Sequence, residues 1–124
     1  MKRILILLLC FVLICPLMTV QAAMPKIIDD AGLLWYEEAE LLESMAQDIV
    51  EEYGMDVVIL TVNSTNGTYI ETFADDFYDY NGYGIGEDAS GVLLVLAMDT
   101  REWAISTCGD AIYAITDFGV QALS

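Results

Sequence analysis

The stretch Asp56-Val57-Val58-Ile59-Leu60-Thr61-Val62 decides the fold of this chain. It is rich in β-branched and other apolar residues and lies between turn-forming residues, so it predicts a buried β-strand. A second run, Val92 to Met98, is apolar over its whole length. We expect this second strand to be central and buried on both faces, because a continuous apolar run leaves no face for water.

Helical patterns flank the first strand. The segment Tyr36 to Tyr53 carries apolar residues at the i, i+4, i+8 spacing of a helix with one buried face, and Gly54 is the expected stop. A second helix is predicted from Tyr69 to Tyr80, where apolar residues repeat at the same spacing. A strand, a helix and a strand joined in this way predict a right-handed βαβ unit with parallel strands.

The remainder of the chain completes a mixed sheet. Asp99-Thr100 forms a turn into Arg101 to Cys108, where polar and apolar residues alternate as in a half-exposed antiparallel strand. The segment Asp110 to Thr116 is ambiguous, and Asp117 is a candidate cap for a third helix that begins at Phe118. The expected fold class is therefore α/β, with helices on a small mixed sheet.

The amino-terminal residues have the pattern of an export signal. Met1 to Arg3 is positively charged, Ile4 to Pro16 is almost entirely apolar, and Ala22-Ala23 supplies the small residues of a cleavage site. We therefore expect residues 1–23 to be a cleaved signal peptide and residues 24–124 to form one domain outside the cytoplasm. The alternative is an uncleaved membrane anchor, because the apolar stretch is close to the minimum length that spans a bilayer.

The charge of the chain excludes several classes of partner. The sequence has 20 acidic and 4 basic residues, and only Lys26 and Arg101 among the basic ones follow the leader. Residues 24–124 thus carry two positive and 20 negative charges, a formal −18. Nucleic acid is excluded because its binding needs Lys and Arg to neutralise phosphates, and direct binding to an anionic membrane surface is disfavoured. The charge either binds cations or keeps an exported protein soluble.

The residue types also exclude several chemistries. The chain has no histidine, which removes Ser-His-Asp and Cys-His catalysis and histidine-ligated zinc. Cys108 is the only cysteine after the leader, and we expect it to be a small core residue at the end of a strand. The glycine-rich loop Asn81 to Gly86 follows a helix and precedes a strand, the reverse of a phosphate-binding loop, so no nucleotide is expected.

Several short motifs together resemble the TPM domain family. They occur in the family's order and span nearly all of residues 24–124: Ile28-Asp29-Asp30-Ala31-Gly32-Leu33-Leu34, Gly84-Ile85-Gly86, Gly91-Val92-Leu93-Leu94-Val95-Leu96, Asp99-Thr100-Arg101 and Ala114-Ile115-Thr116-Asp117. The resemblance implies a three-layer α/β/α sandwich outside the cytoplasm. Such domains are found in thylakoid-lumen photosystem II repair proteins, nicotinic-receptor accessory proteins and bacterial membrane-tethered proteins.

The resemblance also sets an expectation for the end of the chain. Family members usually continue through one or two more helices, often followed by a transmembrane segment, whereas this chain ends at Ser124. We therefore expect a domain that is truncated at its C-terminus, with tethering through a missing segment left open.

Acidic residues in loops form the candidate site. In TPM-like domains Asp29, Asp88 or Glu87, Asp99 and Asp117 match acidic loop positions that come together, and oxygen ligands of this kind suit calcium. Asp99 also leaves the central strand at its carboxyl end, where open α/β sheets collect ligands. The alternative is that Asp29 and Asp117 cap helices and Asp99 only forms a turn.

Three functions follow from these observations. The first is a calcium-binding accessory module that meets a protein partner at the cell envelope. The second is a weak metal-assisted acid phosphatase, an activity attributed to some family members, in which Arg101 would contact the phosphoryl group. Arg101 is otherwise a strand-end residue paired with a carboxylate. The third is an interaction module that binds no ion.

Overall fold

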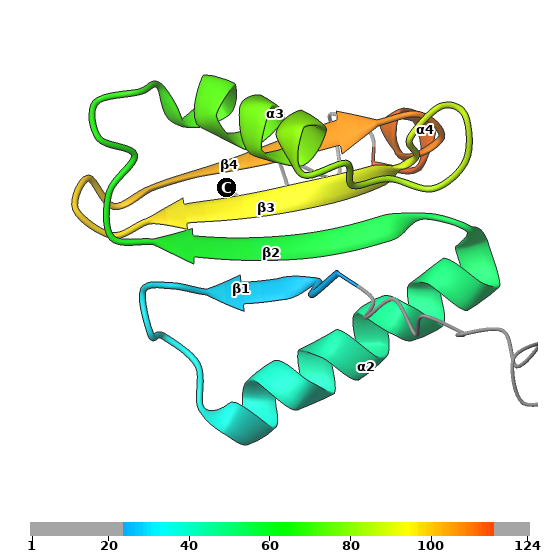
Figure 1. The fold of residues 1–124 in the computed structure, drawn as a ribbon, viewed down its shortest axis with the longest axis horizontal. Helices are drawn as coiled ribbons and strands as arrows, with labels where there is room; N and C mark the ends of the chain where they lie inside the picture. Colours follow the sequence, from blue (N-terminus) through cyan, green and yellow to red (C-terminus); the bar gives the residue numbers. More distant parts are fainter. Residues whose placement is uncertain (1–23, 116–124) are drawn as a thin grey trace, which may run out of the picture.

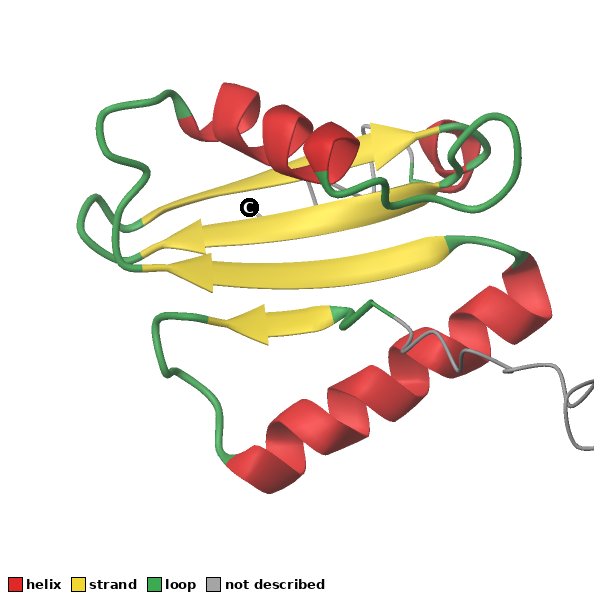
Figure 2. Ribbon diagram, viewed as in Figure 1, coloured by secondary structure: helices red, strands yellow, loops and turns green. Residues whose placement is uncertain are grey.

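The computed structural model describes residues 24–115 as a sheet with helices packed on it (Figure 1). The elements follow in the order β1 (Ile27–Asp29), α2 (Tyr36–Tyr53), β2 (Asp56–Val62), α3 (Ile70–Tyr80), β3 (Gly91–Ala97), β4 (Glu102–Cys108) and α4 (Ala111–Ala114). The four strands form one sheet in the order β1-β2-β3-β4 (Figure 2). The predicted α/β class is confirmed.

The sheet is mixed, as predicted. β1 pairs with β2 in parallel, β2 pairs with β3 in parallel, and β3 pairs with β4 antiparallel. The arrowheads of the first three strands accordingly point the same way in Figure 1, and that of β4 points back. Helix α2 packs along β1 and β2, whereas α3 packs on β3 and β4. The predicted parallel β2-α3-β3 unit is therefore present.

The core lies on one face of the sheet. Burial alternates along β3, so that Leu93 and Val95 are fully buried while Leu94 and Leu96 are only partly buried. The prediction that this strand is buried on both faces is therefore wrong. Its successive side chains point to opposite faces, and the close-packed core with α3 forms on the Leu93 face alone.

The exposed and buried faces of β4 follow from the same alternation. Ala104 pairs with Val95 and is buried in the core, whereas Trp103 on the other face is 39% exposed. Cys108 ends the strand and packs against the core cluster, as expected for a small residue at a strand end.

The helix boundaries agree closely with the sequence pattern. Helix α2 has the predicted bounds. Gly54 ends it in the left-handed conformation, with φ 64°, and donates its backbone N–H to the carbonyl of Val50. Helix α3 begins one residue later than predicted. The short strand β1 has no sequence pattern of its own and was not expected.

Two predictions lie outside the described residues: the signal peptide at residues 1–23 and the third helix capped by Asp117. Within residues 24–115, no helix combines the length and the apolar character needed to cross a bilayer.

Candidate functional site

A pocket opens at the carboxyl ends of β2 and β3, between the β2–α3 loop and the β3–β4 turn. Its volume is about 330 Å³. The residues that line it come from these two connections and from the first turn of α3: Thr65, Gly67, Thr68, Tyr69, Ile70, Glu71, Asp99, Thr100 and Glu102. Loops at the carboxyl ends of parallel strands are where open α/β sheets bind ligands. The pocket is therefore the candidate functional site of the described chain.

The lining of this pocket is acidic and rich in oxygen. Glu71, Asp99 and Glu102 contribute carboxylates, and three threonines contribute hydroxyl groups. Within residues 24–115, no lysine or arginine lines the pocket. Hard cations such as calcium prefer ligands of this kind. An anionic ligand would meet unfavourable charge here.

Asp99 lines the pocket and lies at the carboxyl end of β3, the strand end at which the sequence placed it. It follows β3, and its backbone N–H donates to the carbonyl of Asn63 at 3.0 Å, which joins the β3–β4 turn to the end of β2. Its Oδ1 accepts the N–H of Thr100 at 2.8 Å, and the side chain is exposed. Asp99 therefore closes a turn and also presents a carboxylate to the pocket.

Asp29 has a different role. Its Oδ1 accepts the hydroxyl of Thr61 at 2.5 Å and the N–H of Leu33 at 3.0 Å, and its Oδ2 accepts the N–H of Leu34 at 2.8 Å. The Thr61 hydroxyl above all, and then these backbone donors, lower the pKa of Asp29 below its ordinary value, whereas partial desolvation acts in the opposite direction. This carboxylate thus organises the loop after β1, and it does not line the pocket.

Asp88 and Glu87 lie at the opposite end of the strands, before the amino end of β3. Both precede β3, and the carbonyl oxygen of Asp88 accepts a weak hydrogen bond from Cys108 Sγ at 3.7 Å. Asp99 follows the same strand and lies at its other end. The structure therefore separates Asp88 and Glu87 from Asp99 by the length of β3, and it does not bring them together.

The other two predicted residues are not part of the pocket as described. Asp117 lies outside residues 24–115. Arg101 is in the β3–β4 turn with φ 60°, is exposed, and does not line the pocket. The phosphoryl contact suggested for Arg101 thus has no counterpart among the pocket residues.

Residues 24–115 hold no group of three or more Asp, Glu, Cys or His side chains placed to share one metal ion. The donor set of the pocket matches a hard cation in chemistry, since all of its polar side-chain atoms are oxygens. A cation there would need threonine hydroxyls, backbone carbonyls or water beside one or two carboxylates.

A family model for the TPM domain matches residues 27–123. The chain belongs to the TPM domain family. This TPM domain is 32% identical over 106 residues to the UPF0603 protein YdjH of Bacillus subtilis (strain 168), a match that covers 82% of the chain and 39% of that relative. The chain thus spans about two fifths of the length of the curated relative that it matches.

A solved structure shares the fold. The solution NMR structure of the N-terminal domain of a P. gingivalis protein matches this TPM domain with a TM-score of 0.70 and 23% identity, over 80% of this chain and 63% of that one. At that identity the likeness shows the fold alone.

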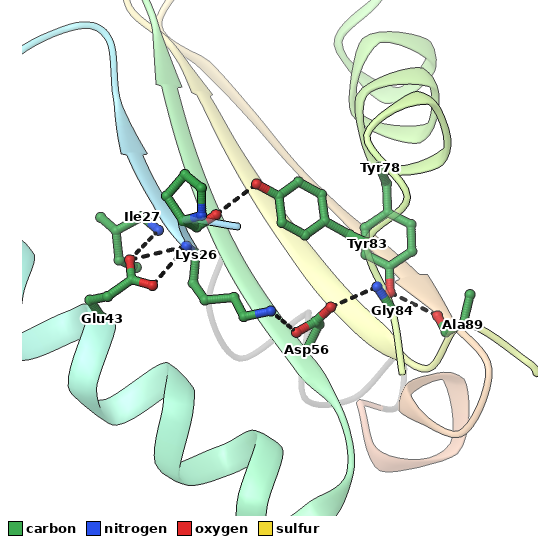
Figure 3. Close-up of polar contacts among 9 residues, drawn as sticks. Lys26, Ile27, Glu43, Asp56, Tyr78, Tyr83, Gly84 and Ala89 are labelled. Carbon is green, nitrogen blue, oxygen red and sulfur yellow. Dashed lines mark hydrogen bonds and ion pairs between the residues drawn. The ribbon is translucent and has the colours of Figure 1, made fainter. Parts of the chain in front are cut away.

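A second polar cluster of the TPM domain lies at the amino ends of β1, β2 and β3 (Figure 3). Lys26 Nζ forms a buried ion pair with Asp56 Oδ1, and the other oxygen of Asp56 accepts the N–H of Gly84 at 2.7 Å. The carboxylate of Glu43 on α2 accepts the backbone N–H groups of Lys26 and Ile27 at 2.9–3.0 Å. These contacts fix the entry of the chain into β1.

Two tyrosines complete this cluster. Tyr83 donates its hydroxyl to the carbonyl of Pro25 at 2.7 Å, and Tyr78 donates its hydroxyl to the carbonyl of Ala89 at 2.8 Å. Burial raises the pKa of both hydroxyls, so both remain protonated donors. No buried side-chain nitrogen or oxygen within residues 24–115 lacks a hydrogen-bond partner, which indicates a structural role for this cluster.

Sequence reasoning missed Glu71, Glu102 and the threonines of the β2–α3 loop. The signal that would have found them is topological, because β2 and β3 are parallel and the loops at their carboxyl ends meet at one edge. It missed the Lys26–Asp56 pair because no local pattern links residues 30 positions apart.

Proposed function

We propose that this TPM domain is an extracytoplasmic accessory module that binds a divalent cation, calcium in the first instance, in the pocket at the carboxyl edge of the sheet. The observation that carries the proposal is the lining of that pocket by Glu71, Asp99 and Glu102, with threonine hydroxyls and no basic side chain from residues 24–115. Calcium accepts carboxylate, hydroxyl, carbonyl and water oxygens in a flexible geometry.

The expected affinity is low. Calcium affinity rises with the number of charged ligands, and residues 24–115 contain no group of three ligands already in place. Weak calcium sites of extracellular modules bind at about 10⁻⁴ to 10⁻³ M. Magnesium should bind less well, because its strict octahedral geometry and tightly held water suit a site built from two loops poorly.

The test is a set of thermal melting curves for the purified protein with and without millimolar calcium or magnesium. A ligand that binds only the native state raises the melting temperature. Asp99→Asn should remove the calcium-dependent shift. Asp48→Asn on α2 is the matched control, because Asp48 is equally exposed but lies outside the pocket. Equal calcium shifts in the wild type and Asp99→Asn would refute the pocket as the site, and the absence of any shift in the wild type would leave an interaction module that binds no ion.

Export is a separate part of the proposal. Cleavage of residues 1–23 would accompany export of the acidic domain from the cytoplasm. The exported protein should begin at Ala23 or Met24, which intact-mass spectrometry determines. A mass that retains residues 1–22 would instead indicate a membrane-anchored module.

The acid phosphatase alternative receives no support from the position of Arg101, which does not line the pocket. The carboxylates there would repel the anionic substrate.

A further inference from the structure

Within residues 24–115, the outer edge of β4 offers backbone groups that have no partner. Among the described strands, β4 is the last of the sheet and pairs with β3 alone. The carbonyl of Ser90 accepts the N–H of Asp56, and the N–H of Met98 donates to the carbonyl of Val62. The backbone N–H and C=O groups of even-numbered residues in β3 therefore point toward β2, and those of odd-numbered residues point toward β4. Through the antiparallel register, the outward N–H and C=O groups on β4 are therefore those of Trp103, Ile105 and Thr107.

These outward groups have no backbone partner within residues 24–115. No hydrogen bond joins the N–H or C=O of Trp103, Ile105 or Thr107 to another described element. A row of free donors and acceptors on an edge strand is a template for an added strand.

The edge also lacks the features that usually protect edge strands. Natural edges are blunted by short length, lysine, proline or bulges. β4 is seven residues long, its pairing with β3 is continuous, and it contains no proline. Its one charged residue is Glu102, at the beginning of the strand. The opposite edge strand, β1, has only three residues.

Acidic side chains of α3 accompany this edge. Helix α3 packs on β4 (Figure 1). Asp75 on this helix accepts the hydroxyl of Ser106 at 2.5 Å, which places its carboxylate beside the strand. Glu71, Asp75 and Asp79 are exposed and follow one another at i, i+4 spacing on α3. They therefore form a negative row along the helix that covers β4.

We propose that the outer edge of β4 is a docking site for an extended, basic segment of a partner protein, which joins the sheet as a further strand beside α3. The backbone groups of Trp103, Ile105 and Thr107 supply the pairing, as in other recognition by strand addition. Lysine or arginine at alternate positions of the segment would face the carboxylates of α3. A second copy fits less well, because antiparallel pairing of two β4 strands would place two acidic α3 helices side by side.

The acidic row shares Glu71 with the proposed calcium pocket, so the docking test is made in chelator, which keeps calcium out of that pocket. The probe is an eight-residue peptide of alternating lysine and valine, titrated into the full chain. We expect saturable binding at low salt and slower hydrogen exchange at the amides of Trp103, Ile105 and Thr107. A peptide with glutamate in place of lysine should not bind.

Thr107→Pro removes one outward N–H without breaking the pairing with β3, since proline is tolerated where the strand N–H faces outward. It should weaken peptide binding by up to about tenfold, because one backbone hydrogen bond to the peptide is lost. Thr107→Val retains the N–H and is the matched control. Asp75→Asn should weaken binding by about two- to fivefold, as expected for a partly screened charge.

A second measurement does not depend on the folding of any variant. A lysine–valine peptide that is N-methylated at alternate residues lacks the donors for pairing and should bind at least about tenfold more weakly than its parent. Equal binding of the two peptides to the wild-type chain would refute the proposal. Slow exchange of the three amides in the free chain, or dimers that Thr107→Pro dissolves, would refute it as well, since the edge would then already be occupied.

Discussion

Lys26 and Asp56 form a buried ion pair that fastens the residues before β1 to the first residue of β2. The Lys26 side chain is 11% exposed and that of Asp56 is 2% exposed, so water screens the pair little. Asp56 also accepts the N–H of Gly84, which ties the loop before β3 to the same point (Figure 3). One carboxylate thus joins three segments that are remote in sequence.

Breaking this pair should destabilise the domain. Lys26→Met or Asp56→Leu should each lower the free energy of unfolding by about 3–5 kcal/mol, because each leaves an uncompensated charge in the interior. The double variant should lose less than the sum of the two, and urea denaturation measures all three. Arg101→Met, which removes an exposed cation, is the control and should change stability by less than about 0.5 kcal/mol. Single variants within 1 kcal/mol of wild type would mean that the pair contributes little.

Gly91 leaves no room for a side chain. A Cβ there would lie 2.4 Å from Tyr78 Oη and 2.8 Å from the carbonyl oxygen of Asp56. Gly91→Ala should therefore cost about 1–3 kcal/mol through overpacking. The cost should fall when Tyr78→Phe is introduced as well, since this change removes the nearest atom, and chemical denaturation of the four proteins in the cycle measures the difference. An unchanged cost in that background would show that Tyr78 is not the obstacle.

The two faces of β3 should differ in their sensitivity to truncation. Leu93 is fully buried in the core, and Leu93→Ala should lower stability by about 2–5 kcal/mol. Leu94 is only partly buried, and Leu94→Ala should cost clearly less because the site loses less packing. Thermal and urea unfolding compare the two variants directly. Equal losses would contradict the one-sided core.

Asp29 should make the stability of the domain depend on acid. Its pKa is lowered from the ordinary 3.8, chiefly by the Thr61 hydroxyl, so its contribution is complete above that value. The contribution is lost as the pH falls through the lowered folded-state pKa. Thr61→Val should raise the pKa of Asp29 toward the ordinary value, which NMR titration of the side-chain carboxyl carbon measures. The stability difference between wild type and Thr61→Val should then narrow at low pH, and an unchanged Asp29 pKa would contradict this assignment.

The sequence alone determined the elements that have a strong local pattern. The sequence patterns predicted the bounds of α2 and β2. Helix and strand periodicity depend on residues a few positions apart, and Gly54 ends α2 because glycine adopts the left-handed conformation easily. The parallel β2-α3-β3 unit followed from the order of these elements and the length of the crossover. Asp99 was assigned correctly to the carboxyl edge for the same reason.

Only the tertiary structure decided what depends on contacts between distant segments. β1 is three residues long and exists because its backbone pairs with Ile59 to Thr61, so it has no periodicity to detect. Asp29 organises the loop after β1, because the pairing of β1 with β2 places the Thr61 hydroxyl beside its carboxylate. Asp88 and Asp99 flank the same strand and therefore lie at its two ends, whereas Glu71 joins Asp99 because consecutive parallel strands bring the β2–α3 loop and the β3–β4 turn to one edge. Local patterns specify each element, but burial, pairing and the grouping of charges arise only when the elements pack together.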